Sequence, residues 1–207
     1  MELEIKNACK SFDGRAVLDD LSLRFPQNGV ACLFGPSGCG KTTLLNCVAG
    51  LQRLDSGEII GTKGRRISYL FQEDRLLPWI SAKDNVAAVL RGRRTENEQT
   101  AAEWLRMVGL AGEEDKLPGE LSGGMRQRVA IARALAYGGE FYLLDEPFHA
   151  LDLQTKRGII RLFQEKTPDA LKLLVTHDPK EAELLADVTY VIGGPPIKII
   201  HTITKNA

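Results

Sequence analysis

A glycine-rich segment contains the first residues that could do chemistry. Residues 35–42 read Gly-Pro-Ser-Gly-Cys-Gly-Lys-Thr and directly follow the apolar run Val30 to Phe34. The segment matches the pattern G-x-x-x-x-G-K-[ST] between a strand and a helix, where a plain glycine-rich turn is the minor alternative. Glycines let backbone N–H groups close around phosphates, and a helix N-terminus favours their negative charge. The pattern predicts a phosphate site with Lys41 at the β and γ oxygens and Thr42 at Mg²⁺.

A second segment pairs two carboxylates. Residues 141–147 read Phe-Tyr-Leu-Leu-Asp-Glu-Pro, an apolar strand that ends in Asp145 and Glu146. A surface turn would explain the acids taken alone. An apolar strand that leads into them favours a metal-binding acid at Asp145 and a water-activating base at Glu146. Together with Lys41, these residues predict a nucleoside triphosphatase.

The third segment is more specific. Residues 121–125 read Leu-Ser-Gly-Gly-Met, and Arg-Gln-Arg-Val-Ala-Ile-Ala-Arg-Ala-Leu follows. Ser122, Gly123 and Gly124 are expected at a helix N-terminus, which is another anion site, although a simple helix cap has the same composition. Val129, Ala132 and Leu135 then face the core. The segment resembles the signature and signature helix of ABC ATPases.

The resemblance extends over nearly the whole chain and implies further roles. Gln72, after the run Ile67 to Phe71, is similar to the family's Q-loop glutamine near Mg²⁺ and the attacking water. His177 is similar to the switch histidine, Asp152 to the D-loop aspartate, and Phe12 to the aromatic that stacks on adenine. By themselves, Gln72 would be a surface Gln, His177 a turn or cap residue, and Phe12 a core Phe.

The implied site therefore has three overlapping sets. The catalytic set is Glu146, His177, Gln72 and Lys41. The metal set is Thr42, Gln72 and Asp145. The nucleotide-contacting set is Phe12, Gly35, Pro36, Ser37, Gly38, Cys39, Gly40, Lys41, Thr42, Thr43, Ser122, Gly123, Gly124 and Asp152. The implied cofactors are ATP and Mg²⁺.

The elements that must position these residues alternate in part of the chain. Strands are expected at 18–25, 30–34, 67–71, 141–144, 171–175 and 197–204. Helices are expected from about Gly40 to Gly50, after Asp152 and after Asp178-Pro179. Between them, Ser81 with Asp84 and Thr95 with Glu98 form candidate capping boxes, and Ala101, Leu105 and Val108 share one helix face.

These elements predict an α/β fold with a helical insert. By resemblance it is a phosphate-loop, RecA-like ATPase core with a small antiparallel β part. Residues 1–207 are expected to form a single domain, with a nucleotide-binding core at 1–79 and 130–207 and a helical subdomain with the signature at 80–129. No C-terminal regulatory domain is expected.

Composition excludes several other classes. Lys plus Arg and Asp plus Glu are both 27 among 207 residues, which gives no reason to expect nucleic acid as a partner. No apolar run approaches the ~18 residues of a membrane span, and the start lacks the apolar core of a signal peptide. Cys9, Cys32, Cys39 and Cys47 have no metal spacing and are expected to be free thiols. The chain is expected in the cytoplasm.

The resemblance also implies an assembly. In the family, the signature of one chain contacts ATP on the phosphate loop of another, so we expect a head-to-tail homodimer with two ATP molecules at its interface. Transmembrane permease subunits are expected to dock near Glu73 to Ser81, on the cytoplasmic face of the membrane, with a solute-binding protein in the complex. Trp79 lies in this segment.

The expected function is ATP hydrolysis that powers an importer. Met125 and the run Leu76-Leu-Pro-Trp-Ile-Ser resemble ATPases of nitrate, taurine, sulfonate and thiamine-precursor importers, although His149 and Phe12 depart from the commonest family residues. The main alternative is a non-transport ABC ATPase of DNA repair or translation. Only 50 residues separate Gln72 from Ser122, which leaves no room for a long coiled coil. A small-molecule kinase would leave the signature without a role.

Overall fold

The chain folds into two compact units. The computed structural model describes residues 2–205. Unit 1 comprises Met1–Tyr69, Glu140–Glu146 and Asp169–Ala207, and unit 2 comprises Leu70–Gly139 and Pro147–Pro168. Unit 2 contains the expected helical segment 80–129 but is larger than it. The separate helical subdomain with those bounds therefore stays a prediction.

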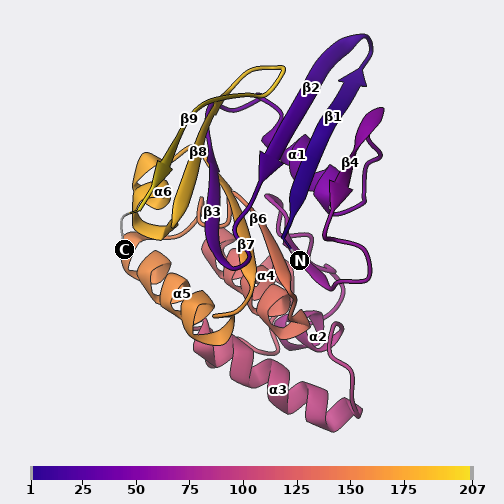
Figure 1. Ribbon diagram of the computed structural model, residues 1–207. Helices are drawn as coiled ribbons and strands as arrows, with labels where there is room; N and C mark the ends of the chain where they lie inside the picture. Colours follow the sequence, from indigo (N-terminus) through magenta and orange to yellow (C-terminus); the bar gives the residue numbers. More distant parts are fainter. Residues whose placement is uncertain (1, 206–207) are drawn as a thin grey trace. The chain divides into compact units, whose positions relative to one another are not determined.

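A six-stranded sheet organises unit 1. Its order is β5-β6-β7-β3-β8-β9, with β3 Gly29–Phe34, β5 Ile67–Leu70, β6 Phe141–Asp145, β7 Leu171–Thr176, β8 Val188–Gly193 and β9 Lys198–Thr204. Strand β7 pairs in parallel with β3 and β6, β8 pairs in parallel with β3, and β9 is antiparallel to β8 (Figure 1). The register sets Phe34 beside Thr176 and Asp145 beside Val175. The loops that follow β3, β6 and β7 therefore leave from one edge of the sheet.

A smaller antiparallel sheet completes the core of unit 1. Its order is β2-β1-β4, with β1 Glu4–Phe12, β2 Arg15–Arg24 and β4 Ser56–Ile60. Helices α1 (Lys41–Val48) and α6 (Pro179–Leu185) also belong to this unit. Apolar side chains of both sheets and of α1 form one buried cluster, which includes Leu18, Leu33, Leu44 and Leu173. This burial is what holds the edge loops on a rigid support.

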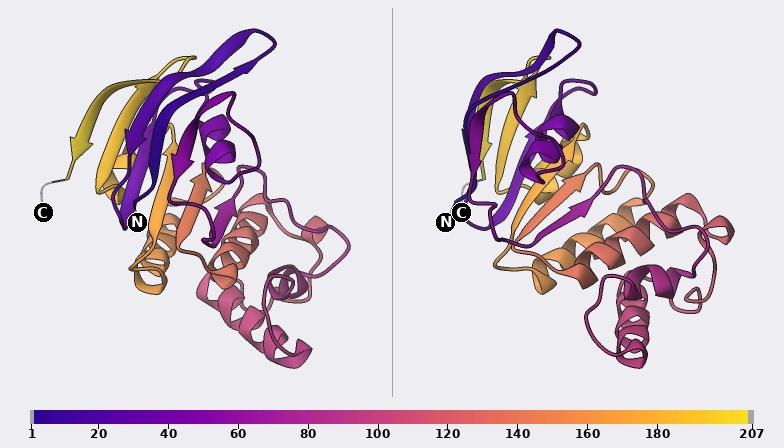
Figure 2. Two further views of the ribbon diagram at one scale, coloured as in Figure 1. Left: turned by 45° about the vertical axis from the view of Figure 1, so that its right-hand side comes forward. Right: turned by 90° about the vertical axis from the view of Figure 1, so that its right-hand side faces the viewer.

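Helices dominate unit 2. They are α2 (Ala82–Ala87), α3 (Arg94–Met107), the short 3₁₀ helix η1 (Pro118–Glu120), α4 (Gly123–Tyr137) and α5 (Leu153–Lys166). Helices α2, α3 and α4 contact one another (Figure 2). Ala101, Leu105 and Val108 are buried, as their spacing predicted.

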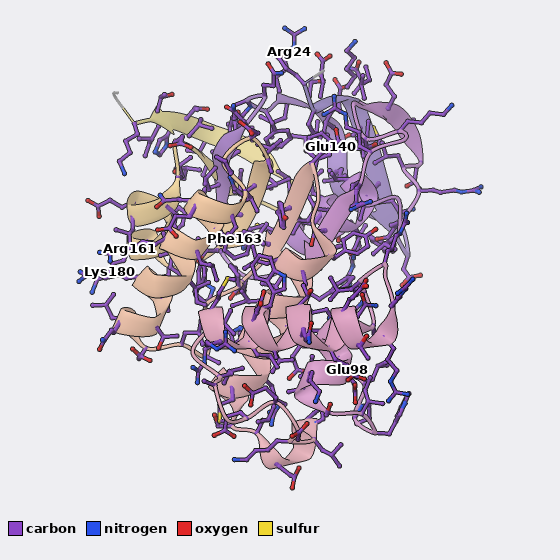
Figure 3. The ribbon with its side chains drawn as sticks, turned by 90° about the horizontal axis from the view of Figure 1, so that it is seen from below. Arg24, Glu98, Glu140, Arg161, Phe163 and Lys180 are labelled. Atoms are coloured by element: carbon purple, nitrogen blue, oxygen red, sulfur yellow. The ribbon has the colours of Figure 1, made fainter. Side chains whose placement is uncertain are left out.

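The helix starts show one confirmed cap and one error. Ser81 caps α2, since its Oγ accepts the N–H of Asp84 at 3.1 Å. The expected capping box of Thr95 with Glu98 is wrong, because α3 already begins at Arg94. Glu98, visible on α3 in Figure 3, accepts instead from Arg94 Nε at 2.8 Å, an i,i+4 ion pair on the exposed side of the helix.

Two further sequence expectations can be compared with the described residues. Across residues 2–205, no helix is both long and apolar enough to cross a bilayer. All four cysteines are free thiols, and burial raises the pKa of Cys32 to about 12.

Candidate functional site

The phosphate loop connects β3 to α1 in unit 1. Gly38 and Gly40 have φ of 78° and 109°, a region that side chains other than glycine rarely adopt. At Gly35, a Cβ would lie 2.4 Å from the carbonyl oxygen of Ile192, so the backbone comes too close for any other residue. Gly40 precedes α1 and has no side-chain cap. The loop therefore combines side-chain-free backbone with a helix N-terminus, which suits a bound anion.

Lys41 extends over this loop. Its Nζ donates to the carbonyl oxygens of Gly35 and Pro36, each at 2.7 Å, and lies 3.9 Å from Cys39 Sγ. Lys41 and Cys39 are both buried, whereas Pro36 and Ser37 are exposed. A buried ammonium surrounded by polar backbone groups is a strong local positive charge. This charge lies against the carbonyl oxygens of the glycine-rich loop.

Thr42 and Asp145 form a pair of side chains in unit 1 whose oxygens could ligate a metal ion. Thr42 Oγ1, in the first turn of α1, donates to Asp145 Oδ2 at 2.7 Å. Asp145 is only 2% exposed, at the end of β6. Burial raises the pKa of its carboxyl group, and the hydrogen bond from Thr42 opposes that rise. Hydroxyl and carboxylate oxygens are the donors that Mg²⁺ prefers, so this pair fits the predicted ion.

Glu146 and His177 meet at the ends of two neighbouring strands. Glu146 has φ of 47°, and its N–H donates to the carbonyl oxygen of Val175 at 2.9 Å. Glu146 Oε1 lies 2.8 Å from His177 Nδ1. An ionised carboxylate only accepts, so this contact is a hydrogen bond from His177 when Nδ1 carries the proton. Sequence reasoning named both residues but not their contact.

Phe12 also belongs to unit 1. It ends β1, is 40% exposed, and has the ammonium of Lys10 5.2 Å from its ring centre. Phe12 is thus not a core side chain, which was the ordinary alternative at this position. An exposed aromatic ring is available for stacking.

The signature residues start a helix of unit 2. Ser122 is the N-cap of α4, and its Oγ accepts the N–H of Met125 at 3.2 Å. Ser122 and Gly123 are exposed. A Cβ on Gly124 would lie 2.8 Å from the carbonyl oxygen of Ala150, so a second backbone segment passes close to it. Val129, Ala132 and Leu135 are buried along one face, as predicted.

A polar pocket of about 460 Å³ lies beside the signature within unit 2. Its lining residues are Gln72, Glu73, Asp74, Gly123, Arg126, Gln127, His149 and Ala150. Gln72 and His149 are exposed, whereas Gln127 is buried and donates to the carbonyl oxygen of Pro147 at 2.8 Å. The pocket brings the Gln72 segment close to the start of α4.

Arg126 connects these two segments, a role that sequence reasoning missed. Its Nε donates to Asp74 Oδ2 at 3.0 Å and its Nη1 to the carbonyl oxygen of Leu121 at 2.9 Å. Arg133, seven positions further along α4, donates to the carbonyl oxygens of Asp74 and Arg75. Two arginines seven residues apart share a helix face, which was the one signal the sequence offered.

Asp152 serves as a helix cap in unit 2. Its Oδ1 accepts the N–H groups of Gln154 and Thr155, and its Oδ2 accepts the Thr155 hydroxyl at 2.6 Å. The hydrogen bonds from Thr155 lower the pKa of the Asp152 carboxyl group. This geometry explains the aspartate structurally and leaves its nucleotide role a prediction.

Comparison with known proteins gives the family. Residues 18–149 match the family model described as "ABC transporter". The chain is 42% identical to the taurine import ATP-binding protein TauB of Pseudomonas aeruginosa, over 90% of this chain and 75% of that protein. It is 39% identical to the aliphatic sulfonates import ATP-binding protein SsuB 2 of Pseudomonas syringae pv. tomato, over 96% and 85% of the two chains.

A solved structure agrees with this result. The dimeric, post-hydrolysis structure of the ATP-binding cassette MJ0796 bound to ADP and Pi superposes with a TM-score of 0.87. That chain is 28% identical to this one, and 99% of each chain is covered. The predicted α/β ATPase fold is confirmed. The chain therefore belongs to the ABC transporter family, as an ATP-binding and ATP-hydrolysing subunit.

Proposed function

We propose that this ATPase powers the import of a small anionic solute of the taurine or sulfonate type. The relatives named above are import ATP-binding proteins for taurine and aliphatic sulfonates. These names support transport and give no support to the alternative in DNA repair or translation. The observation that carries the catalytic part is the pair Glu146–His177 beside Asp145.

Nucleotide binding is assigned to the phosphate loop. In this proposal, backbone N–H groups of the loop hold the β- and γ-phosphates, with Pro36 contributing none. The ammonium of Lys41 exchanges the carbonyl oxygens of Gly35 and Pro36 for phosphate oxygens. Phe12 stacks on the adenine ring in this proposal. Its exposure at the end of β1 supports this role.

Mg²⁺ binding is assigned to Thr42 and Asp145, with Gln72 as a further ligand. The Thr42–Asp145 pair supports this assignment because its oxygens lie 2.7 Å apart. A bound divalent cation would neutralise charge on the phosphate oxygens. It would also favour the ionised form of Asp145, which burial alone disfavours.

Hydrolysis is assigned to Glu146 and His177. Glu146 accepts a proton from the attacking water, whose oxygen forms a bond to the γ-phosphorus while the bond to the bridging oxygen of ADP breaks. His177 holds the carboxylate of Glu146 through Nδ1 and faces the γ-phosphate with the rest of its ring. The 2.8 Å contact supports this division of roles.

The signature residues are assigned to the nucleotide of a second copy. Ser122, Gly123 and Gly124 are exposed or half-buried at the start of α4, and Asp152 lies at the start of α5 in the same unit. The dimeric state of the MJ0796 cassette supports a homodimer, and we propose the head-to-tail form with two ATP molecules at the interface. Each chain then supplies half of two sites.

A membrane partner is assigned to the segment Glu73 to Ser81. Trp79 is 72% exposed and Leu77 is 39% exposed. The segment is nevertheless well fixed, because Asn85, only 1% exposed, hydrogen-bonds the backbone at Leu77, Ile80 and Ser81. A preorganised loop that presents a large aromatic side chain suits docking.

The partner in this proposal is a cytoplasmic segment of permease subunits. The ATPase would then be peripheral on the cytoplasmic face of the cell membrane, with a solute-binding protein in the complex.

The proposal is tested by replacing the base. In the Glu146→Gln variant, steady-state ATP hydrolysis is expected to fall by about 10²- to 10⁴-fold, the usual worth of a general base. ATP binding is retained, so ATP-bound dimers should accumulate in size-exclusion chromatography.

The matched control is Glu140→Gln, which changes a glutamate just before the other end of β6 (Figure 3). This control should hydrolyse ATP like the wild type. Wild-type turnover in Glu146→Gln would remove Glu146 from the mechanism.

A further inference from the structure

A buried hydrogen-bond chain lies behind His177 at the junction of β7 and α6. Thr176, the last residue of β7, donates from Oγ1 to Glu181 Oε2 at 2.7 Å. Thr176 Oγ1 also accepts the N–H of Asp178 at 3.0 Å. Thr176 and Asp178 are the chain neighbours of His177. The Thr176 hydroxyl group thus connects the two residues that flank His177 in the chain.

The hydrogen-bond chain of Thr176 and Glu181 is buried, whereas the side chain of His177 is exposed. Thr176 is 2% exposed and Glu181 is 7% exposed, whereas the His177 side chain is 57% exposed. Lys180, the neighbour of Glu181, lies on the outer side of α6 and points away from the protein (Figure 3). Burying a carboxylate is costly unless it is hydrogen-bonded. Glu181 meets this condition through the hydrogen bond that it accepts from Thr176.

The negative charge of Glu181 also reaches the strand before the phosphate loop. Burial raises the pKa of Cys32 on β3, Glu181 raises it further, and Lys41 lowers it. Glu181 therefore lies close enough to the interior of β3 to influence a residue that Lys41 also influences. Its position is internal to the catalytic unit and not part of its surface.

We propose that Thr176 and Glu181 are positioning residues that fix His177 for its contact with Glu146. Packing restrains the exposed ring of His177 little, so its direction depends on the backbone that carries it. The Thr176 hydroxyl, oriented by Glu181, sets that backbone on both sides. Asp178 adds a second restraint, since its carboxylate accepts the N–H of Lys180 at 2.9 Å. The result is the 2.8 Å approach of Nδ1 to Glu146.

This inference rests on the proposed role of His177 in hydrolysis. It goes further by distinguishing His177, which contacts Glu146, from Thr176 and Glu181, which orient His177. If His177 is no longer oriented toward Glu146, turnover should fall while the affinity for ATP is kept, because the groups assigned to phosphate binding lie on other elements. A misplacement of about 1 Å costs up to roughly 100-fold in rate.

The first experiment measures ATP hydrolysis by Thr176→Val, which keeps the β-branched shape and removes the hydroxyl. We expect kcat to fall roughly 10- to 100-fold and the KM for ATP to stay within about twofold. Thr176→Ser, which keeps the hydroxyl, should restore turnover. Thr189→Val is the matched control, because Thr189 is a similarly buried threonine on β8. An unchanged kcat in Thr176→Val would overturn the proposal.

The second experiment is a double-mutant cycle with His177→Ala. If Thr176 acts through His177, the double variant turns over no more slowly than His177→Ala alone. A multiplied loss would mean a general structural role and would overturn the proposal. Should Thr176→Val fail to fold, Glu181→Gln takes its place in the same cycle with the same criterion. Wild-type turnover in His177→Ala would instead contradict the proposed function itself.

Discussion

The two units present their functional residues in opposite ways. In unit 1, Lys41, Thr42 and His177 each contact another group of the same unit, and Asp145 is buried. In unit 2, Ser122 and Gly123 are exposed at the start of α4. In unit 1 these side chains have hydrogen-bond partners in the same unit, and unit 2 presents the start of a helix at its surface.

This difference suggests a division of labour. Groups that must move a proton or hold a metal ion need fixed positions, which buried parallel strand ends supply. A surface that must bind and release a partner's nucleotide needs access, which an exposed helix start supplies. Each of the following predictions tests one side of this contrast.

The largest effect on stability is expected when one glycine of the phosphate loop is compared with one glycine of the signature. In Gly40→Ala, the new Cβ would lie 2.6 Å from Val17 Cγ1 at a φ of 109°, and we expect a loss of about 1–3 kcal/mol. In Gly123→Ala, the nearest atom to the new Cβ is Arg126 Nη2 at 3.9 Å, and a change below about 0.5 kcal/mol is expected. Urea unfolding of both variants measures this, and equal losses would contradict the contrast.

A smaller effect is expected at Asp145 in nucleotide-free protein. Its folded pKa is raised above the ordinary value of 3.8, so its favourable contribution is complete below that pH and is lost as pH rises through the folded pKa. Asp145→Asn keeps an oxygen for the Thr42 hydroxyl and removes the buried charge. The variant should therefore melt above the wild type at pH 7, and the gap should narrow toward pH 4.

Thermal melting between pH 7 and pH 4, without nucleotide and metal, measures the Asp145 effect. A variant that melts below the wild type at pH 7 would show that the charge is stabilising in the empty site.

The smallest effect on the isolated subunit is expected at Trp79. Since this side chain is 72% exposed, Trp79→Ala should change stability by less than about 0.5 kcal/mol and leave soluble ATP hydrolysis unchanged. Transport by the reconstituted complex should be lost. Leu153→Ala on α5, also strongly exposed, is the control that keeps transport. Loss of soluble activity in Trp79→Ala would indicate a structural role.

Local patterns predicted much of the fold. The phosphate loop, the apolar strands β3, β6 and β7, and the helix start at Ser122 each depend on residues adjacent in sequence, and each was identified. Strands β1, β4 and β8 were not. In β1 the pairing with both neighbours has register shifts, and Asn7 has φ of 46°, so its inward and outward residues do not alternate regularly.

Contacts between distant residues were beyond reach. Asp74 and Arg126 are 52 positions apart, and their ion pair depends on how α4 packs in unit 2. The Glu146–His177 contact depends on the register of β6 against β7. The Thr95–Glu98 error has a local cause, since the helix begins two residues earlier, after the extended residue Arg93.

The central claim is that the phosphate loop and the signature work as halves from two copies. Lys41→Ala disables the first half. Gly123→Asp disables the second by adding a negative charge at an exposed, spacious position where an acid suits the helix itself. Each variant alone should be inactive in ATP hydrolysis.

The decisive measurement is the ATPase activity of an equimolar mixture of these two variants. A mixed dimer retains one site with Lys41 from one chain and Gly123 from the other. Random pairing and independent sites then predict recovery of roughly a quarter of wild-type activity. A mixture no more active than its separate components would contradict the account.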